Sequence, residues 1–158
     1  MKLKSFSEMN CSLAQALEVV GERWTLLILR DAFFGIRRFE EFQRRLGIAR
    51  NILSARLARL VDEGILERHS VSPGGKWAEY RLTEKGRSLQ PALLALVQWG
   101  DRWYPNEDGL RVDFYDRRSG ESIAPIRPHN QQGEPLQPRD IRARPGPGGP
   151  KKLVAEAE

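Results

Sequence analysis

Residues 37–82 read RRFEEFQRRLGIARNILSARLARLVDEGILERHSVSPGGKWAEYRL, and this stretch decides the fold. Two short amphipathic helices are expected to meet at Gly47, and the second is expected to end at Gly64. Two strand-like runs, 65–71 and 77–82, then flank the sequence Ser-Pro-Gly-Gly-Lys at 72–76. A helix, a turn, a basic helix and a two-stranded ribbon with a positive tip make a winged helix-turn-helix. Such a fold presents one helix to the major groove of DNA and the ribbon to the neighbouring backbone.

The distribution of charge supports a polyanionic partner. The chain has a net charge of +5, and residues 1–104 carry all of it, with 17 basic against 12 acidic side chains. Residues 105–158 are neutral, with 9 of each sign. Residues 37–59 alone hold seven arginines against Glu40 and Glu41. A solvated helix face is the ordinary explanation for a charge run, but here the run coincides with the helix-turn-helix pattern and therefore indicates double-stranded DNA.

The helix expected over residues 50–63 carries the residues that would meet DNA. Its leucines at 53, 57 and 60 and Val61 face inward, and small or polar side chains face outward. A backbone carrying small side chains can approach base edges, and Asn and Arg pair with adenine and guanine. The predicted DNA contacts on this helix are Arg50, Asn51, Ser54, Arg56 and Arg59. Arg56 lies beside the apolar stripe. Its position is as consistent with an ion pair to Glu40 or Glu41, or with a phosphate contact, as with reading a base.

Two further cations are expected on the phosphate backbone. Arg38 precedes the helix that starts near Phe39, where a cation can clamp a phosphate. Lys76 lies at the tip of the wing. Trp77 beside it is open to two interpretations, a contact with a sugar edge or a core position, and tryptophan at a strand is more often core.

Helices on both sides of this stretch complete the domain. Ser12 and Gln15 fit a capping box, which predicts a first helix from about Leu13 to Val20. A second, largely apolar helix through Trp24 and Phe33 is expected to be buried. After Thr83 a long helix should run to about Tyr104, kinked or broken at Pro91 because proline lacks an amide hydrogen.

The last helix is apolar on two sides, which indicates a homodimer. One stripe holds Leu89, Leu93, Leu96, Gly100 and Trp103, and a second holds Ala92, Ala95 and Trp99. A helix with two apolar sides at the end of a small domain needs a second surface, most simply another copy. The expected interface comprises Leu13, Leu17, Leu89, Leu93, Leu96, Trp99 and Trp103. An aromatic cleft between subunits is the place where a hydrophobic effector would bind.

Composition changes after Pro105, because eight of the ten prolines lie from there on. Residues 112–115 resemble a strand, and the nonamers RRSGESIAP (117–125) and NQQGEPLQP (130–138) share a Gly-Glu pair that predicts two hairpin turns. We therefore predict three parts: a winged-helix and dimerisation domain at 1–104, a small β-hairpin module at 105–144, and a disordered tail at 145–158. The fold class is mainly α (α+β).

Other classes of protein are excluded by what the sequence lacks. It has no apolar run near the roughly 18 residues of a membrane span and no signal-peptide core, so a cytoplasmic protein without membrane contact is expected. A single cysteine allows no internal disulfide. No nucleophile set, phosphate loop or dinucleotide motif is present, so no enzyme is expected. The alternative is a winged helix used only for protein assembly, against which the arginines of residues 37–59 argue.

From residue 9 to residue 104 the chain resembles the HxlR-type family of bacterial winged-helix regulators. The matching segments are residues 11–68 and 79–103, which agree with the family in type, order and spacing. The resemblance implies a homodimeric transcription factor whose fourth helix reads the major groove. A two-fold dimer is in turn expected to protect an inverted-repeat operator. Some relatives also carry a C-terminal extension with paired cysteines that bind zinc. This chain has none there, and His69 and His129 cannot replace four ligands, so neither metal nor cofactor is expected.

The resemblance also implies a possible response to oxidants, since some members sense them through a cysteine near the first helix. Cys11 occupies that place, where the helix dipole favours a thiolate. With no second cysteine in the chain, a switch would need an intersubunit disulfide or an adduct with a small thiol. The other interpretation, a small packing residue, stays open at this point.

Overall fold

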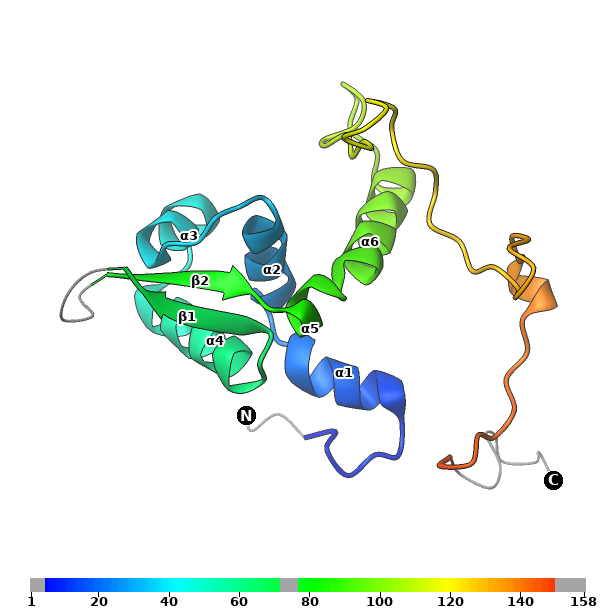
Figure 1. The fold of residues 1–158 in the computed structure, drawn as a ribbon, viewed down its shortest axis with the longest axis horizontal. Coiled ribbons are helices and arrows are strands. Elements are labelled where there is room, and N and C mark those ends of the chain that lie inside the picture. Colours follow the sequence, from blue (N-terminus) through cyan, green and yellow to red (C-terminus); the bar gives the residue numbers. More distant parts are fainter. Residues whose placement is uncertain (1–4, 72–76, 150–158) are drawn as a thin grey trace. The chain divides into compact units, whose positions relative to one another are not determined.

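The structure is a computed structural model that describes residues 5–71 and 77–149. It contains two compact units, residues 1–90 and 91–158. The elements, labelled in Figure 1, are α1 (Ser12–Val20), α2 (Thr25–Phe33), α3 (Phe39–Leu46), α4 (Arg50–Asp62), β1 (Leu66–Ser70), β2 (Ala78–Leu82), α5 (Glu84–Arg87), α6 (Gln90–Trp103) and a 3-10 turn at Pro138–Asp140. The predicted winged helix-turn-helix is confirmed.

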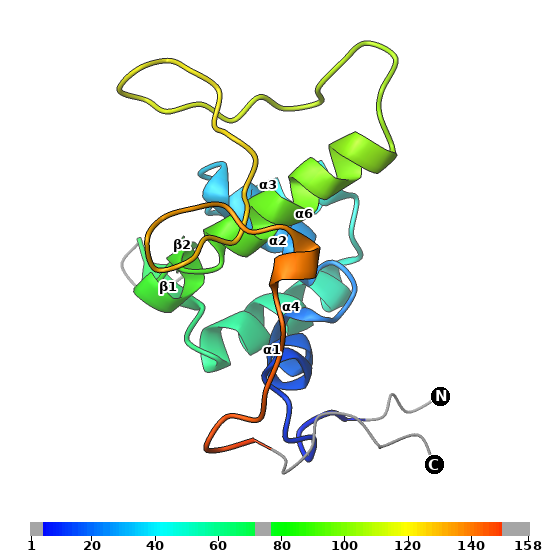
Figure 2. The ribbon, with the colours of Figure 1, turned by 90° about the vertical axis from the view of Figure 1, so that its right-hand side faces the viewer.

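The core of the first unit lies between three helices and the first strand, which Figures 1 and 2 show gathered together. All three leucines predicted on the inner side of α4 are buried, and Phe42 of α3 is fully buried. The core also holds Ile28, Leu29, Ile48, Ile65 and Leu66. α2 is less enclosed than we expected, since Leu27 is 41% exposed and Trp24 lies before the helix with a left-handed φ of 81°.

Two glycines end α3 and α4 as predicted. Gly47 has φ 61° and Gly64 has φ 66°, a region that side chains disfavour. The turn at Gly47 sets the angle between α3 and α4, and buried Ile48 anchors it in the core. The turn at Gly64 directs the chain from α4 into β1.

The wing is a two-stranded antiparallel sheet in which Leu66 pairs with Leu82 and Ser70 with Ala78. The outer edge of β2 is also used, because Tyr80 N donates to Arg37 O (2.8 Å) and Arg38 forms a bridge with Glu79. The residues before α3 therefore attach to the wing. The predicted tip at 72–76, including Lys76, lies outside the described residues.

The predicted capping box at the start of α1 is wrong. α1 begins at Ser12 with Cys11 in the N-cap position, and no side chain caps it. Gln15 turns backward instead, and its Nε2 donates to the carbonyls of Ser7 and Met9, both at 3.0 Å. The preceding segment thus competes for the side chain that the capping box needs.

The C-terminal helix is broken rather than continuous. α5 ends at Arg87 and α6 begins at Gln90, so Pro91 occupies the first turn of α6, where no helical amide partner is required. The break at the proline is the one we predicted. The second compact unit begins at Pro91 and so takes in all of α6 after Gln90, and the predicted domain boundary at residue 104 stays a prediction.

The extension after Pro105 is less regular than the predicted β-hairpin module. Residues 112–115 form no strand; Tyr115 and Ser122 make a single bridge, as do His129 and Pro135. The two hairpin turns do form, with Gly120 at φ 75° and Gly133 at φ 84°. Pro125 follows the first turn, and Pro128 and Pro135 flank the second. Because prolines lack amide donors, they limit pairing beyond one bridge. Disorder of the 145–158 tail remains a prediction.

Candidate nucleic-acid interface

The outer side of α4 carries the small and polar surface that the sequence predicted. Asn51, Ser54, Ala55 and Ala58 are all exposed. Within the described part of the chain, the side chains of Asn51 and Ser54 form no hydrogen bond, so their polar atoms face solvent. A helix with this surface can enter a groove closely and offer an amide and a hydroxyl to base edges.

The three arginines of α4 differ in what holds them. Arg50 lies over the ring of Phe39, with its guanidinium carbon 4.8 Å from the ring centroid. Arg59 is exposed and pairs with Glu63 at 2.9 Å, four residues on. Both guanidinium groups keep donors that can turn to a ligand.

Arg56 faces inward and joins α4 to the turn before α2. Its Nη1 lies 2.5 Å from Glu22 Oε2, and its Nε donates to Arg23 O at 3.3 Å. Neither Glu40 nor Glu41 is its partner, as we had considered. Its geometry supports a structural role more than contact with a base.

Arg38 and Arg50 meet in a groove of about 190 Å³ between the starts of α3 and α4 and the wing. Sequence reasoning missed the third arginine in this groove, Arg68 of β1. The remaining lining residues are Phe39, Glu40, Trp77, Ala78 and Tyr80. Trp77 is 54% exposed, so its interpretation as a core residue is wrong. Three cations beside an aromatic surface suit a phosphate–sugar backbone.

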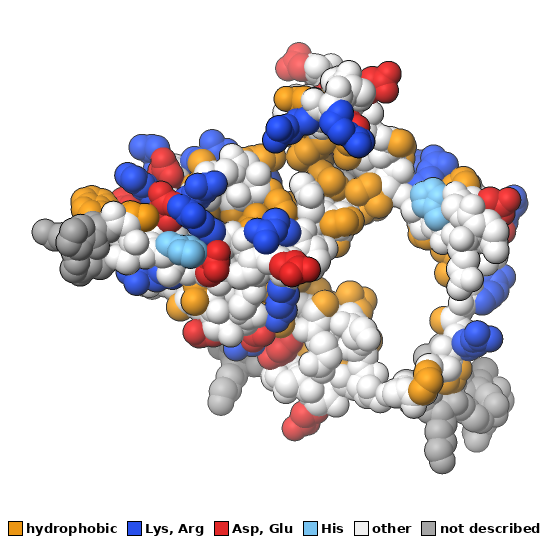
Figure 3. Space-filling view, viewed as in Figure 1, with side chains coloured by type: hydrophobic (Ala, Val, Ile, Leu, Met, Phe, Trp, Pro, Cys, Tyr) orange, Lys and Arg blue, Asp and Glu red, His pale blue; other side chains and the backbone are white. Residues whose placement is uncertain are grey.

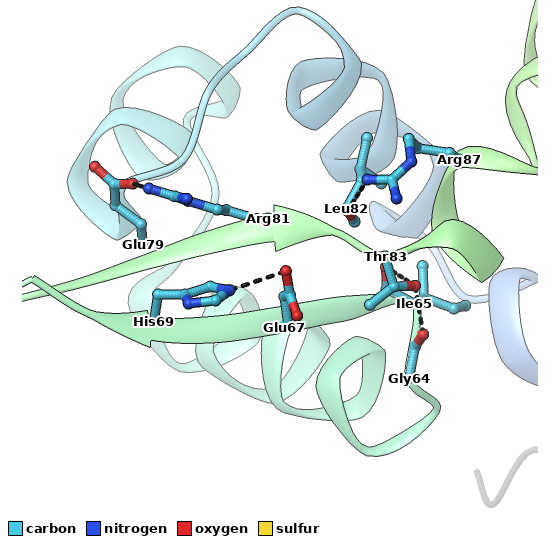
Figure 4. A network of polar contacts seen from close by, with 9 residues as sticks. All are labelled: Gly64, Ile65, Glu67, His69, Glu79, Arg81, Leu82, Thr83 and Arg87. Atoms are coloured by element: carbon cyan, nitrogen blue, oxygen red, sulfur yellow. Dashed lines mark hydrogen bonds and ion pairs between the residues drawn. The ribbon is translucent and has the colours of Figure 1, made fainter.

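Further arginines surround Glu79, which pairs with His69 near the outer end of the wing. Figure 4 shows Arg81 reaching Glu79, whose Oε2 accepts from Arg81 Nη2 at 2.9 Å. The hydrogen bond from Arg81 lowers the pKa of Glu79, and the charges of Arg37 and Arg38 lower it further. Figure 4 also shows His69, whose Nε2 lies 2.9 Å from Glu67 Oε1. Figure 3 shows this basic surface (blue) over α3 and the strands.

Residues predicted for other roles are not among those that line this groove. Cys11 is exposed, so it is not a packing residue within its own chain. Most of the predicted dimer residues are exposed too: Leu13 (67%), Leu17 (42%), Leu96 (52%), Trp99 (56%) and Trp103 (60%). Leu93 is half-buried. Leu89 is half-buried and packs against the core of its own unit, and its place in the interface stays a prediction.

Comparison with known proteins agrees with this geometry. Residues 19–108 match the HxlR-like helix-turn-helix family. The chain belongs to this family. HxlR-like relatives named as HTH-type transcriptional regulators include Rv3095 of Mycobacterium tuberculosis and Mb3122 of Mycobacterium bovis, each 45% identical over 144 residues and matched over 91% of both chains. The protein is therefore of the transcriptional-regulator class and not an enzyme.

Solved structures give the same result. The putative transcription factor PA1607 is 40% identical with a TM-score of 0.81, covering 89% of this chain and 99% of its own. PA1374 of Pseudomonas aeruginosa is 37% identical with a TM-score of 0.61, covering 92% and 96%. The reduced redox regulator HypR is 31% identical with a TM-score of 0.55, covering 58% and 92%. The family match ends at residue 108, whereas the first two structures align beyond it, so they share the extension.

No helix among the described residues is both long and apolar enough to cross a membrane.

Proposed function

We propose that this chain is a dimeric, sequence-specific transcriptional regulator that acts in the cytoplasm and binds an inverted-repeat operator. The observation that carries the proposal is the exposed small and polar side of α4 next to the groove of Arg38, Arg50 and Arg68. α4 enters the major groove, Asn51 and Ser54 meet base edges, and the groove arginines hold the backbone. Arg59 serves as a flanking contact, and Lys76 of the wing tip adds a phosphate contact.

This division of roles predicts two different losses. Asn51→Ala should cost about 1–3 kcal/mol on the operator and relax its base preference. Arg68→Ala should weaken binding to every DNA sequence alike and reduce its salt dependence. Arg117→Ala is the matched control, because it removes an exposed arginine from the extension and should change neither property.

The measurement is a mobility shift on the DNA upstream of the protein's own gene and its neighbour, followed by footprinting at several salt concentrations. Protection of two half-sites one helical turn apart would support the dimeric reader. A complete absence of DNA binding at low salt would reject the proposal and favour a winged helix used for assembly. If Arg68→Ala binds DNA as well as Arg117→Ala does, the groove does not hold the DNA backbone. The rest of the proposal would stand.

The dimer uses the exposed leucines of α1 and the exposed tryptophans of α6. An apolar side chain more than half exposed gains free energy when it is covered, at about 25 cal/mol per Å². Sedimentation equilibrium of Leu96→Ser against the unchanged chain tests the dimer, with a weaker association constant expected. An unchanged association constant would remove α6 from the interface.

An oxidant acts on the regulator through Cys11. The support is the exposure of its thiol and the similarity to HypR, which is described as a redox regulator. A disulfide between two Cys11 thiolates would release two electrons to the oxidant. Diamide should therefore alter the shifted complex and give a covalent dimer on non-reducing gels, and Cys11→Ser should abolish both effects. A diamide response that persists in Cys11→Ser would exclude this site.

A further inference from the structure

The second compact unit contains a cavity of about 700 Å³ that its own side chains do not fill. α6 contributes Trp99 and Trp103 to its wall, and the extension contributes Leu110, Val112, Phe114 and Ile126. We refer to it as the α6 cavity. All of these residues belong to residues 91–158, so the cavity lies within one unit.

Polar contacts hold the extension in place around the α6 cavity. The Gln98 side chain makes two of them: its Oε1 accepts from Ile126 N (2.7 Å), and its Nε2 donates to Ala124 O (3.3 Å). Arg111 Nη1 donates to Tyr104 O (2.9 Å) and Asp101 Oδ1 (3.3 Å). These contacts attach the extension to α6 at Gln98 and Asp101 and to Tyr104 just beyond it.

Several apolar side chains around the α6 cavity are exposed, although Arg102 lies over the ring of Trp103 and Tyr104 lies against Trp99. Leu110 is 67% exposed, Val112 40% and Ile126 39%, besides the two tryptophans. Trp99 and Trp103 alone leave on the order of 250 Å² of indole surface in water, since an aromatic side chain presents about 150–250 Å². An apolar patch of several hundred Å² marks an interaction surface.

We propose that a second copy of this chain covers this patch, so that the extension is part of the dimer interface. The proposal rests on the dimeric function proposed above and deepens it. A stable interface buries about 800 Å² per partner. Leu110, Val112 and Ile126 share the cavity wall with Trp99 and Trp103, so the exposed apolar side chains of the extension and of α6 form one surface that supplies a large part of that area.

The charge of the extension agrees with this occupant. Residues 105–158 carry 9 basic and 9 acidic side chains, so two copies can meet there without net repulsion. The surface around Arg38, Arg50 and Arg68, by contrast, would repel its own copy and suits a polyanion. The two surfaces therefore select different partners.

The test measures the dimer dissociation constant of the full chain by sedimentation equilibrium. The double variant Leu110→Ser with Val112→Ser should raise this constant at least tenfold. Tyr115→Ser is the matched control, because Tyr115 is 59% exposed in the same extension but does not line the α6 cavity, and it should change the constant less than twofold.

Leu96→Ser separates failure of this inference from failure of the dimer itself. Weakening by Leu96→Ser but not by the double variant would overturn the role of the extension and leave the α6 dimer standing. No effect of either variant would overturn both. The dye anilinonaphthalenesulfonate adds a second readout: fluorescence that rises only when the dimer dissociates supports coverage by a copy. Strong binding to the intact dimer would show the cavity open and overturn the proposal in favour of a small-molecule site.

Discussion

Asp31 of α2 is a fully buried carboxylate that two arginines share. Its Oδ1 accepts from Arg30 Nη2 at 2.8 Å, and its Oδ2 accepts from Arg45 Nε at 3.3 Å, which joins α2 to α3. Asp31→Ala should lower the free energy of unfolding by about 2–3 kcal/mol, because it strands two cations. That figure lies below the full cost of breaking a buried pair, since the Arg30 and Arg45 side chains are 35% and 45% exposed.

Urea unfolding of Asp31→Ala beside Arg45→Ala measures this effect. Arg45→Ala should cost less, because Asp31 keeps Arg30. Equal losses of unfolding free energy for the two variants would mean that the Asp31 carboxylate contributes only through its ion pair with Arg45 of α3.

Gly86 is a position where a side chain has no room. A Cβ there would overlap the carbonyl oxygen of Ile65 and lie 3.0 Å from a Leu82 methyl. Thr83 holds this approach in place: its Oγ1 donates to Gly64 O at 2.7 Å and accepts from Gly86 N at 3.0 Å. Figure 4 shows the Thr83 side chain next to the carbonyls of Gly64 and Ile65.

Gly86→Ala should therefore lower the free energy of unfolding by about 1–3 kcal/mol through overpacking. Glu84→Ala, at an exposed position of the same α5, should change it by less than about 0.5 kcal/mol. Thermal melts of the two variants at one protein concentration make the comparison. Equal melting temperatures would show that the Ile65 carbonyl can move aside.

At the scale of elements, the segment before α1 is held by two side chains of α1, Gln15 at Ser7 and Met9 and the Glu18 carboxylate at its start. Glu18 accepts from Phe6 N at 2.8 Å and from Ser5 Oγ at 2.9 Å. These hydrogen bonds, that of Phe6 foremost, lower the pKa of Glu18 below its ordinary 4.5. The attachment is therefore complete above the ordinary pKa and is lost as pH falls through the lowered one.

The Phe6 amide should accordingly be protected from hydrogen exchange at neutral pH and lose protection in acid. Glu18→Gln should reduce its protection at neutral pH and flatten the pH dependence, because the neutral amide is a weaker acceptor. The amide of Ile28 inside α2 serves as the internal reference. Protection of Phe6 that is independent of pH in the unchanged chain would exclude this attachment.

The helices and the wing were predictable because their signals are local. The 3–4 spacing of Leu53, Leu57 and Leu60 and the glycine at 64 depend on neighbours within a few turns. The capping box failed because Gln15 is bound to Ser7 and Met9, a contact that no helix pattern contains. Arg56 was ambiguous for a similar reason, since Glu22 lies 34 residues earlier in the chain.

The site was predictable in part. Asn51 and Ser54 follow from the outer side of one helix, but Arg68 joins Arg38 and Arg50 only because the wing folds back beside α3. Its signal in the sequence was a single arginine on a strand, which carries little information alone. The extension was the least predictable part. Its two glycine turns depend on neighbouring residues and were predicted, but the contacts of its apolar side chains depend on residues far away in the chain.

At the scale of the whole molecule, the DNA-binding surface and the dimer surface should be distinguishable by the salt dependence of DNA binding. Four phosphate contacts per subunit give about eight for a dimer, and hence a slope of log K against log salt near −7. Arg68→Ala removes one contact in each subunit and should bring the slope to about −5.4. The Leu110→Ser, Val112→Ser variant should keep the slope of the unchanged chain, since neither substitution removes a cationic side chain.

That variant should still bind the operator more weakly at low protein concentration, because dissociation of the dimer precedes dissociation from DNA. Raising its concentration above its dimer dissociation constant should restore the affinity, by mass action. Fluorescence anisotropy with a labelled operator, run across salt and protein concentration, measures both effects. Affinity for the operator that stays low at saturating protein would mean that the extension contacts DNA directly. A salt slope that becomes shallower together with that loss of affinity would identify the arginines of the extension as the contacts.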